Sequence, residues 1–90
     1  MNFKVRWAQA ALNELAKAWV EADSELRKKI TAAANEIDVQ LEANPYQLGE
    51  SRPDGGKIHF VYPLGFIFRI EQDEQTVSVW HVWPFSRKSP

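Results

Sequence analysis

The side chains best suited to acid–base or charge-stabilising chemistry in this sequence are arginines and a histidine. Arg69 stands inside the apolar run Phe66–Glu71, where a permanent cation costs desolvation unless it faces an open cleft or a carboxylate. Arg52 follows a Gly-Glu-Ser turn, and its planar fork of donors fits a phosphate or a carboxylate. His81 stands in the last apolar run and can transfer a proton near neutral pH. These three residues form the candidate catalytic set.

Each of these residues also has a purely structural interpretation. Arg69 can be an exposed arginine that pairs with Glu71 or Glu50. Loop arginines such as Arg52 commonly bond local carbonyl groups. A partly buried histidine in a strand is a common structural feature, and this applies to His81. Both interpretations therefore stay open for all three residues.

The sequence indicates neither a metal nor a cofactor. It contains no cysteine, and its two histidines, His59 and His81, have no third ligand nearby. The lack of cysteine excludes disulfides and thiolate nucleophiles. Disulfides are the cross-links that usually stabilise small secreted domains. The opening segment, residues 1–6, has no continuous apolar run of the kind that a signal peptide or a membrane span needs. We therefore expect a cytoplasmic protein with no cofactor, metal or membrane attachment.

The size and charge of the chain limit its partners. Ninety residues, of which 44% are hydrophobic, suffice for one domain with a small core. We expect a single domain over residues 1–90, with a folded core over 1–83 and a tail over 84–90. The net charge of −1 gives no long-range attraction for phosphate, so a nucleic acid would need a local cationic patch.

The periodicity of the first half predicts one strand and two helices. Residues 2–7 alternate between apolar and cationic side chains, as a strand with one buried face requires. From residue 8 the apolar residues recur by threes and fours, which is typical of a helix. The apolar stripe predicted for this first helix is Ala8, Leu12, Leu15, Trp19 and Ala22. A second helix is predicted from Asp23-Ser24 to Asn44-Pro45, close enough to form an antiparallel hairpin. Its predicted stripe is Leu26, Ile30, Ala33, Ile37 and Leu41.

The second half predicts a loop and three strands. Proline and glycine fill residues 44–56, which indicates a structured loop. Strand-like runs follow at Lys57–Tyr62, Gly65–Glu71 and Thr76–Trp83. In the middle run the apolar face can pack on the helices, which leaves Arg69 on the other face. The expected fold is α+β, in the order β-α-α-β-β-β, with the helical hairpin on one face of a small, mainly antiparallel sheet.

Several short motifs carry a resemblance to a known family. They are the strand Val5-Arg6-Trp7 before an Ala-rich helix, the helix end Ile37-Asp38-Xaa-Xaa-Leu41, the segments Asn44-Pro45 and Gly49-Glu50-Ser51-Arg52, and the hairpin of Phe66–Glu71 with Val77-Ser78-Val79. Together they cover roughly residues 3–83. Over this length the chain resembles the RelE/ParE superfamily, the toxins of bacterial type II toxin–antitoxin systems.

That resemblance implies a toxin that a cognate antitoxin neutralises by wrapping a flexible segment around it. The family divides between ribosome-dependent mRNA cleavage, as in RelE, and poisoning of DNA gyrase, as in ParE. Metal-independent RNA cleavage would use Arg69, Arg52 and His81 to move protons and offset phosphate charge, with Lys57 and Arg87 as further cations.

The chain also departs from the RNA-cleaving branch. Its tail has no tyrosine, and its last strand ends in Trp83-Pro84-Phe85 where that branch has a basic run. Gyrase poisoning needs no catalytic set and is compatible with these departures. A degenerate family member that binds a partner without poisoning anything is a third hypothesis.

The charges of the second helix predict one partner-binding surface. Arg27, Lys28 and Lys29 stand in its first turns and acidic residues stand towards its end, opposite to what the helix dipole favours. This basic end is hypothesised to meet an acidic antitoxin or a nucleic acid. The alternative is a solvated face whose charges have no partner to recognise.

Aromatic residues at the end of the last strand predict a second partner-binding surface. At most two of Trp80, Trp83 and Phe85 can share the core face of one strand, so we expect one of them to be exposed. An exposed aromatic residue gives a partner a large contact area at little cost in entropy. Trp83 and Phe85 are the predicted anchors.

Overall fold

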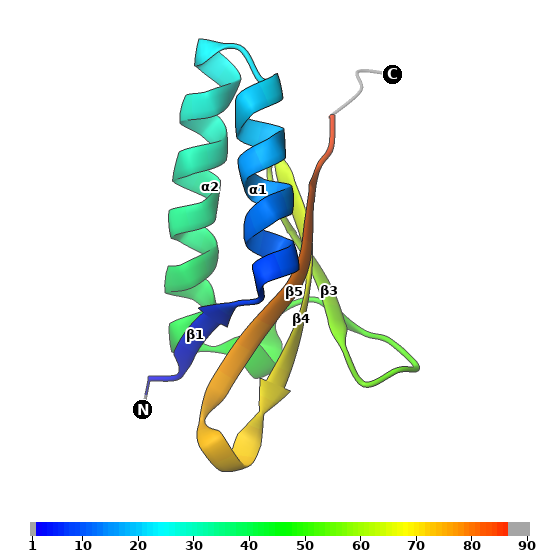
Figure 1. Cartoon of the computed structure of the whole chain (residues 1–90). Coiled ribbons are helices and arrows are strands. Elements are labelled where there is room, and N and C mark those ends of the chain that lie inside the picture. Colours follow the sequence, from blue (N-terminus) through cyan, green and yellow to red (C-terminus); the bar gives the residue numbers. More distant parts are fainter. Residues whose placement is uncertain (1, 87–90) are drawn as a thin grey trace.

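The computed structural model describes residues 2–86 and has two layers, with both long helices on the same side of the sheet (Figure 1). The elements in chain order are β1 (Lys4–Trp7), α1 (Gln9–Glu21), α2 (Ser24–Ala43), β2 (Glu50–Ser51), β3 (Lys57–Val61), β4 (Leu64–Glu71) and β5 (Thr76–Pro84). Short 3-10 turns lie at Pro45–Gln47 and Gln72–Glu74. The α+β class and the helical hairpin are confirmed.

The strands form one mixed sheet in the order β1-β5-β4-β3-β2. The pairs β5-β4, β4-β3 and β3-β2 are antiparallel, whereas β1 pairs with β5 in parallel, with Lys4 opposite Thr76. The short strand β2 lies within the segment that was predicted to be a loop. The first and last strands are therefore neighbours, and β5 lies between β1 and the β3-β4 hairpin.

The helix α1 buries a different stripe from the predicted one. Its buried residues are Ala11 and Ala18, whereas Leu12 and Trp19 are 43% and 42% exposed. The stripe predicted from large apolar side chains was wrong at these two positions because α1 packs against β5 through alanines. Small side chains allow the helix and the strand to approach closely. The larger residues are turned towards α2 and solvent.

The helix α2 has the predicted core stripe. Ile30, Ala33, Ile37 and Leu41 are buried against the sheet. The helix begins as expected, because the side chain of Asp23 accepts a hydrogen bond from the Leu26 N–H at 2.8 Å. One polar contact also ties α2 to the edge of the sheet, since the indole Nε1–H of Trp7 donates to Asp38 Oδ1 at 2.8 Å.

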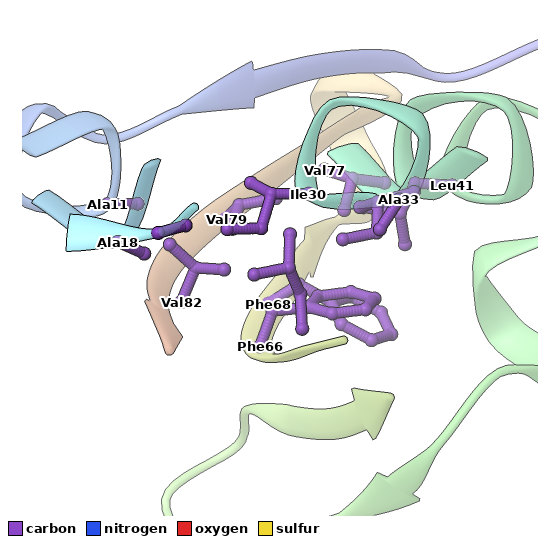
Figure 2. Close-up of a cluster of buried hydrophobic side chains, with 13 residues drawn as sticks. Ala11, Ala18, Ile30, Ala33, Leu41, Phe66, Phe68, Val77, Val79 and Val82 are labelled. Atoms are coloured by element: carbon purple, nitrogen blue, oxygen red, sulfur yellow. The ribbon is translucent and has the colours of Figure 1, made fainter. Parts of the chain in front are cut away.

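The core lies between α2 and the central strands, where side chains from α1, α2, β4 and β5 interdigitate (Figure 2). Phe66 and Phe68 of β4 are fully buried in it. On β5, Val79 and Val82 both point into the core although they are three residues apart. A β-bulge explains this spacing: Ile67 pairs with His81 and Phe68 with Val79, so Trp80 is the extra residue.

The bulge corrects the prediction for the aromatic residues of β5. Val77, Val79 and Val82 occupy the core face, and Trp80 and Trp83 are half-buried outside it. The strand also extends through Pro84, one residue beyond the predicted end. The bulge therefore turns Trp80 and His81 away from the core, and both become available for other contacts.

Candidate functional site

Arg69 lies on the outer face, which we define as the sheet face opposite the helices. Its neighbours Phe68 and Ile70 point to the core side, as the alternation predicted. The side chain of Arg69 is 43% exposed, and its Nε lies 3.8 Å from Glu71 Oε1. Its Cζ lies 5.6 Å from the ring centroid of Trp80. The cation is thus compatible with the apolar strand because it has solvent on one side and a ring and a carboxylate beside it.

The loop that carries Arg52 lies against this guanidinium. The Arg52 N–H donates to Gly56 O at 2.8 Å, and the Gly55 N–H donates to Arg52 O at 3.1 Å, which closes a tight turn. A Cβ on Gly55 would lie 3.8 Å from Cζ of Arg69, so the tip of the turn reaches Arg69. The side chain of Arg52 itself lies 3.9 Å, Nε to Oδ1, from Asp54. The structure therefore places Arg52 and Arg69 at the same corner of the outer face.

His81 contacts a residue that the sequence did not single out, Glu14 of α1. Its Nδ1 lies 3.4 Å and 3.3 Å from the two carboxylate oxygens of Glu14. The Val82 N–H also donates to Glu14 Oε1 at 3.1 Å. Glu14 stands between the buried Ala11 and Ala18 on the face of α1 that packs on β5, and its side chain is 42% exposed. The apolar stripe predicted for α1 did not include this face, so no local pattern in the sequence marked Glu14.

Of the two further predicted cations, Lys57 and Arg87, the described residues include Lys57. Lys57 donates from Nζ to Tyr46 O at 2.7 Å, which ties β3 to the turn after α2. Arg87 lies outside the described residues. Arg69, the Arg52 turn and the pair of His81 and Glu14 therefore define the candidate site, and Trp80 lies between Arg69 and His81.

The basic end of α2 has a structural role. This role explains part of the charge distribution of α2, which is opposite to what the helix dipole favours. Arg27 donates to Trp19 O at 2.8 Å and to Val20 O at 2.9 Å, which are carbonyls at the end of α1. A cation at the C-terminus of one helix is favourable, so Arg27 suits α1 although it stands at the start of α2. Lys28 pairs with Glu25 at 3.7 Å in solvent, and Lys29 lines a groove between α2 and β3.

Trp83 and Phe85 belong to an aromatic cluster near the C-terminal ends of β3 and β5. Phe60 lies edge-on to Trp83, with centroids 6.2 Å apart, and to Phe85, with centroids 5.3 Å apart. Tyr62 lies 5.6 Å from Phe85 in the same way. The predicted anchors are thus both half-buried against Phe60, which is the more exposed member of the cluster and which the sequence did not single out.

An apolar groove separates α1 from α2 on the side away from the sheet. It has a volume of about 340 Å³. It is lined by Leu12, Leu15, Ala16, Trp19, Val20, Ile30, Thr31, Ala34 and Asn35. The groove continues past Trp19 to Arg27 and Lys28, where its lining becomes cationic. Large apolar side chains that α1 does not bury in the core are therefore gathered beside a basic surface.

His59 and His81 lie apart from each other in the fold. His59 lies on the core side of β3, where its ring meets Phe66 edge-on at 5.8 Å. Burial, together with the nearby charge of Lys57, lowers the pKa of His59 below its usual value. Within residues 2–86 no group of three or more His, Asp or Glu side chains is arranged to hold a metal ion. Neither long helix in that part of the chain has the apolar length needed to cross a membrane.

The arrangement of elements is similar to that of several solved toxin–antitoxin structures. One is the RelBE2 toxin–antitoxin complex from Mycobacterium tuberculosis, with a TM-score of 0.73 and 20% identity over 93% of this chain and 99% of that one. Another is the chromosomal ParDE system from P. aeruginosa, with a TM-score of 0.73 and 13% identity over 93% and 97%. The isolated E. coli toxin RelE matches with a TM-score of 0.58 and 12% identity over 97% and 88%. No protein-family model and no curated protein sequence matches the chain.

These similarities cover almost the whole chain and include both the helical hairpin and the sheet. The chain therefore has a RelE/ParE-like fold, as the sequence motifs predicted. Sequence identities of this size establish the fold, and the same fold can host different activities.

Proposed function

We propose that this protein is the toxin of a type II toxin–antitoxin pair and that a cognate antitoxin holds it inactive by covering the groove between α1 and α2. The fold supports this proposal, because similar chains occur in toxin–antitoxin complexes. The observation that carries it is the set of large apolar side chains left in solvent along α1, namely Leu12, Trp19 and Val20. A small domain that exposes a contiguous apolar groove gains from a partner that covers it.

Growth assays test the toxin role directly. Expression of the chain alone is expected to arrest growth, and co-expression of a small protein encoded beside it is expected to restore growth. Arrest with codon-positioned mRNA cuts would indicate an mRNA endonuclease, and arrest with induction of the DNA-damage response would indicate a gyrase poison. The absence of any arrest would contradict the toxin role and favour a degenerate, binding-only module.

A matched pair of variants tests the groove as the antitoxin site. Val20 and Val39 are both exposed valines on helices, at 64% and 56%, and only Val20 lines the groove. Val20→Asp is expected to weaken antitoxin binding at least about tenfold, because a buried unpaired carboxylate costs more than about 1.4 kcal/mol. Val39→Asp should leave the dissociation constant nearly unchanged. Equal effects of the two substitutions in a calorimetric titration would place the antitoxin elsewhere.

A second candidate function is metal-independent endoribonuclease activity, with Arg69, Arg52 and His81 as the catalytic set. The observation in its favour is the half-exposed Arg69, which the Arg52 turn and Trp80 hold on the outer face. A fixed guanidinium at such a position can offset the negative charge that develops on a phosphate during cleavage. Arg69→Ala is expected to abolish growth arrest while antitoxin binding persists. Unchanged arrest by Arg69→Ala would exclude this candidate.

A further inference from the structure

Glu14 is anchored by the backbone of β5 and contacts a titratable side chain, His81, with its carboxylate. The Val82 N–H donates to Oε1 at 3.1 Å, which holds the carboxylate at the open edge of the strand. The parallel pairing of β1 with β5 ends at Val79, so this amide lies beyond the last β1 partner. The other oxygen, Oε2, lies 3.3 Å from Nδ1 of His81.

The chemistry of the two groups determines which nitrogen of His81 carries the hydrogen. An ionised carboxylate can only accept hydrogen bonds, so a bond between Glu14 and Nδ1 requires the hydrogen on Nδ1. A neutral imidazole has one N–H, and Nε2 is then an unprotonated base. The side chain of His81 is 54% exposed, which leaves Nε2 within reach of solvent or a substrate.

We propose that Glu14 is a positioning residue that holds His81 in the Nδ1-protonated tautomer, so that Nε2 of His81 is the proton acceptor at the edge of the outer face. The use of this base in catalysis rests on the endoribonuclease candidate described above. The bulge supports a common site, because it turns both Trp80 and His81 off the core face while Arg69 lies over Trp80. A carboxylate that fixes the tautomer of a histidine is a recurrent device in acid–base catalysis.

The surroundings of His81 identify Glu14 as the charge it contacts. The residue opposite His81 on β4 is Ile67, which is uncharged. A second, shallow groove lies between α1 and the end of β5, and Glu14 and Val82 both line it. Lys17 and Glu21 line this groove too, one and two turns after Glu14 on α1. Glu21 can therefore serve as a control carboxylate, because it lies on the same helix and in the same groove.

Glu14→Gln distinguishes the proposed control of the His81 tautomer from a purely structural role, in which Glu14 only accepts the Val82 N–H at the edge of β5. The glutamine carbonyl oxygen can still accept the Val82 N–H, and its NH₂ group then faces His81. Because an NH₂ group donates, it requires an unprotonated Nδ1 and moves the hydrogen to Nε2. The edge contact is thus kept while the tautomer is reversed. Glu21→Gln is the control, and its His81 tautomer should match that of the unchanged protein.

Nitrogen-15 NMR of the imidazole ring measures the tautomer without any assay of activity. The unchanged protein is expected to show protonated Nδ1 and bare Nε2 in neutral His81, and Glu14→Gln is expected to show the reverse at an unchanged melting temperature. His81→Gln assigns the signals, since it removes those of His81 and leaves those of His59. A bare Nδ1 in the unchanged protein, or an unchanged tautomer in Glu14→Gln, would overturn the proposal.

RNA cleavage assays, run with and without ribosomes, then test whether the positioned base is used. If the protein cleaves RNA, Glu14→Gln and His81→Gln should each slow cleavage by about 100-fold, which is typical of the loss of a positioned acid–base group. Glu21→Gln should cleave at the normal rate. Full activity of Glu14→Gln with a reversed tautomer would overturn the catalytic use. If the unchanged protein cleaves no RNA, the endoribonuclease candidate fails, and the tautomer result still decides the positioning role.

Discussion

The guanidinium of Arg27 lies over the indole ring of Trp19, with Cζ 4.4 Å from the ring centroid. The same guanidinium donates to the carbonyl oxygens of Trp19 and Val20. One side chain at the start of α2 therefore closes the end of α1 and fixes the wall of the groove between the helices. Arg27, for which the sequence predicted a partner-binding role, therefore has an observed structural role.

Arg27→Ala is expected to lower the free energy of unfolding by about 1 kcal/mol. The substitution removes the hydrogen bonds to two helix-end carbonyls and one cation–π contact, all at an exposed position. Arg27→Lys keeps the charge and loses the planar fork, so it should recover only part of the loss. Urea unfolding followed by circular dichroism measures both. Identical stabilities for the lysine variant and the unchanged protein would show that the charge alone suffices.

Gly65→Ala is expected to destabilise the protein by about 1–3 kcal/mol through overpacking. A Cβ at this position would lie 2.7 Å from Cε2 of Trp83, so the indole ring would have to leave the aromatic cluster. Gly56→Ala is the control, because its Cβ would meet neighbours no closer than 3.4 Å. Thermal unfolding and tryptophan emission should change for Gly65→Ala and far less for Gly56→Ala. Equal behaviour of the two would show that Trp83 moves freely.

Trp7→Phe is expected to cost about 1–2 kcal/mol, because it removes the donor to Asp38 and leaves a part-buried carboxylate without that partner. Asp38→Asn keeps an acceptor oxygen and should cost less. The comparison is made by denaturant unfolding at constant pH. A larger loss for Asp38→Asn than for Trp7→Phe would show that the charge, and not the hydrogen bond, links β1 to α2.

The stability of the protein should fall in mildly acidic solution, in part through His59. Burial lowers the pKa of His59 in the folded state below the ordinary value of 6.5, so the unfolded chain takes up the proton first. The free energy of unfolding therefore decreases as the pH falls below about 6.5, until the folded state is also protonated. His59→Phe keeps a ring against Phe66 and should show a smaller decrease between about pH 7.5 and about pH 5.5. An equal decrease in both proteins would assign it to other groups.

The elements with a clear polar–apolar alternation were predicted correctly from the sequence. The core stripe of α2 and the outward direction of Arg69 both follow from side-chain periodicity. The stripe of α1 was wrong because the surface that packs most closely carries alanines, which the hydrophobic pattern ranks below leucine and tryptophan. The bulge at Trp80 inserts one residue into β5, and nothing in the local alternation marks it.

The contacts between distant segments were not predictable from local patterns. The parallel pairing of β1 with β5 joins segments at the two ends of the fold, and periodicity carries no information on which strands pair. The contact of Glu14 with His81 depends on that arrangement, because it joins residues 67 positions apart. The sequence could therefore identify His81 as a candidate and could not identify the residue that orients it.

The parallel pairing of the first strand with the last one limits the order in which the molecule can form. Lys4–Trp7 leave the ribosome before the rest of the described fold, yet their neighbours in the sheet, Thr76–Val79, are among the last residues of that fold to be synthesised. Until then β1 has no hydrogen-bonding partner strand, and the α-helical hairpin can cover only an incomplete sheet. Synthesis of the intervening residues therefore takes on the order of several seconds before the finished surface exists for any partner to capture.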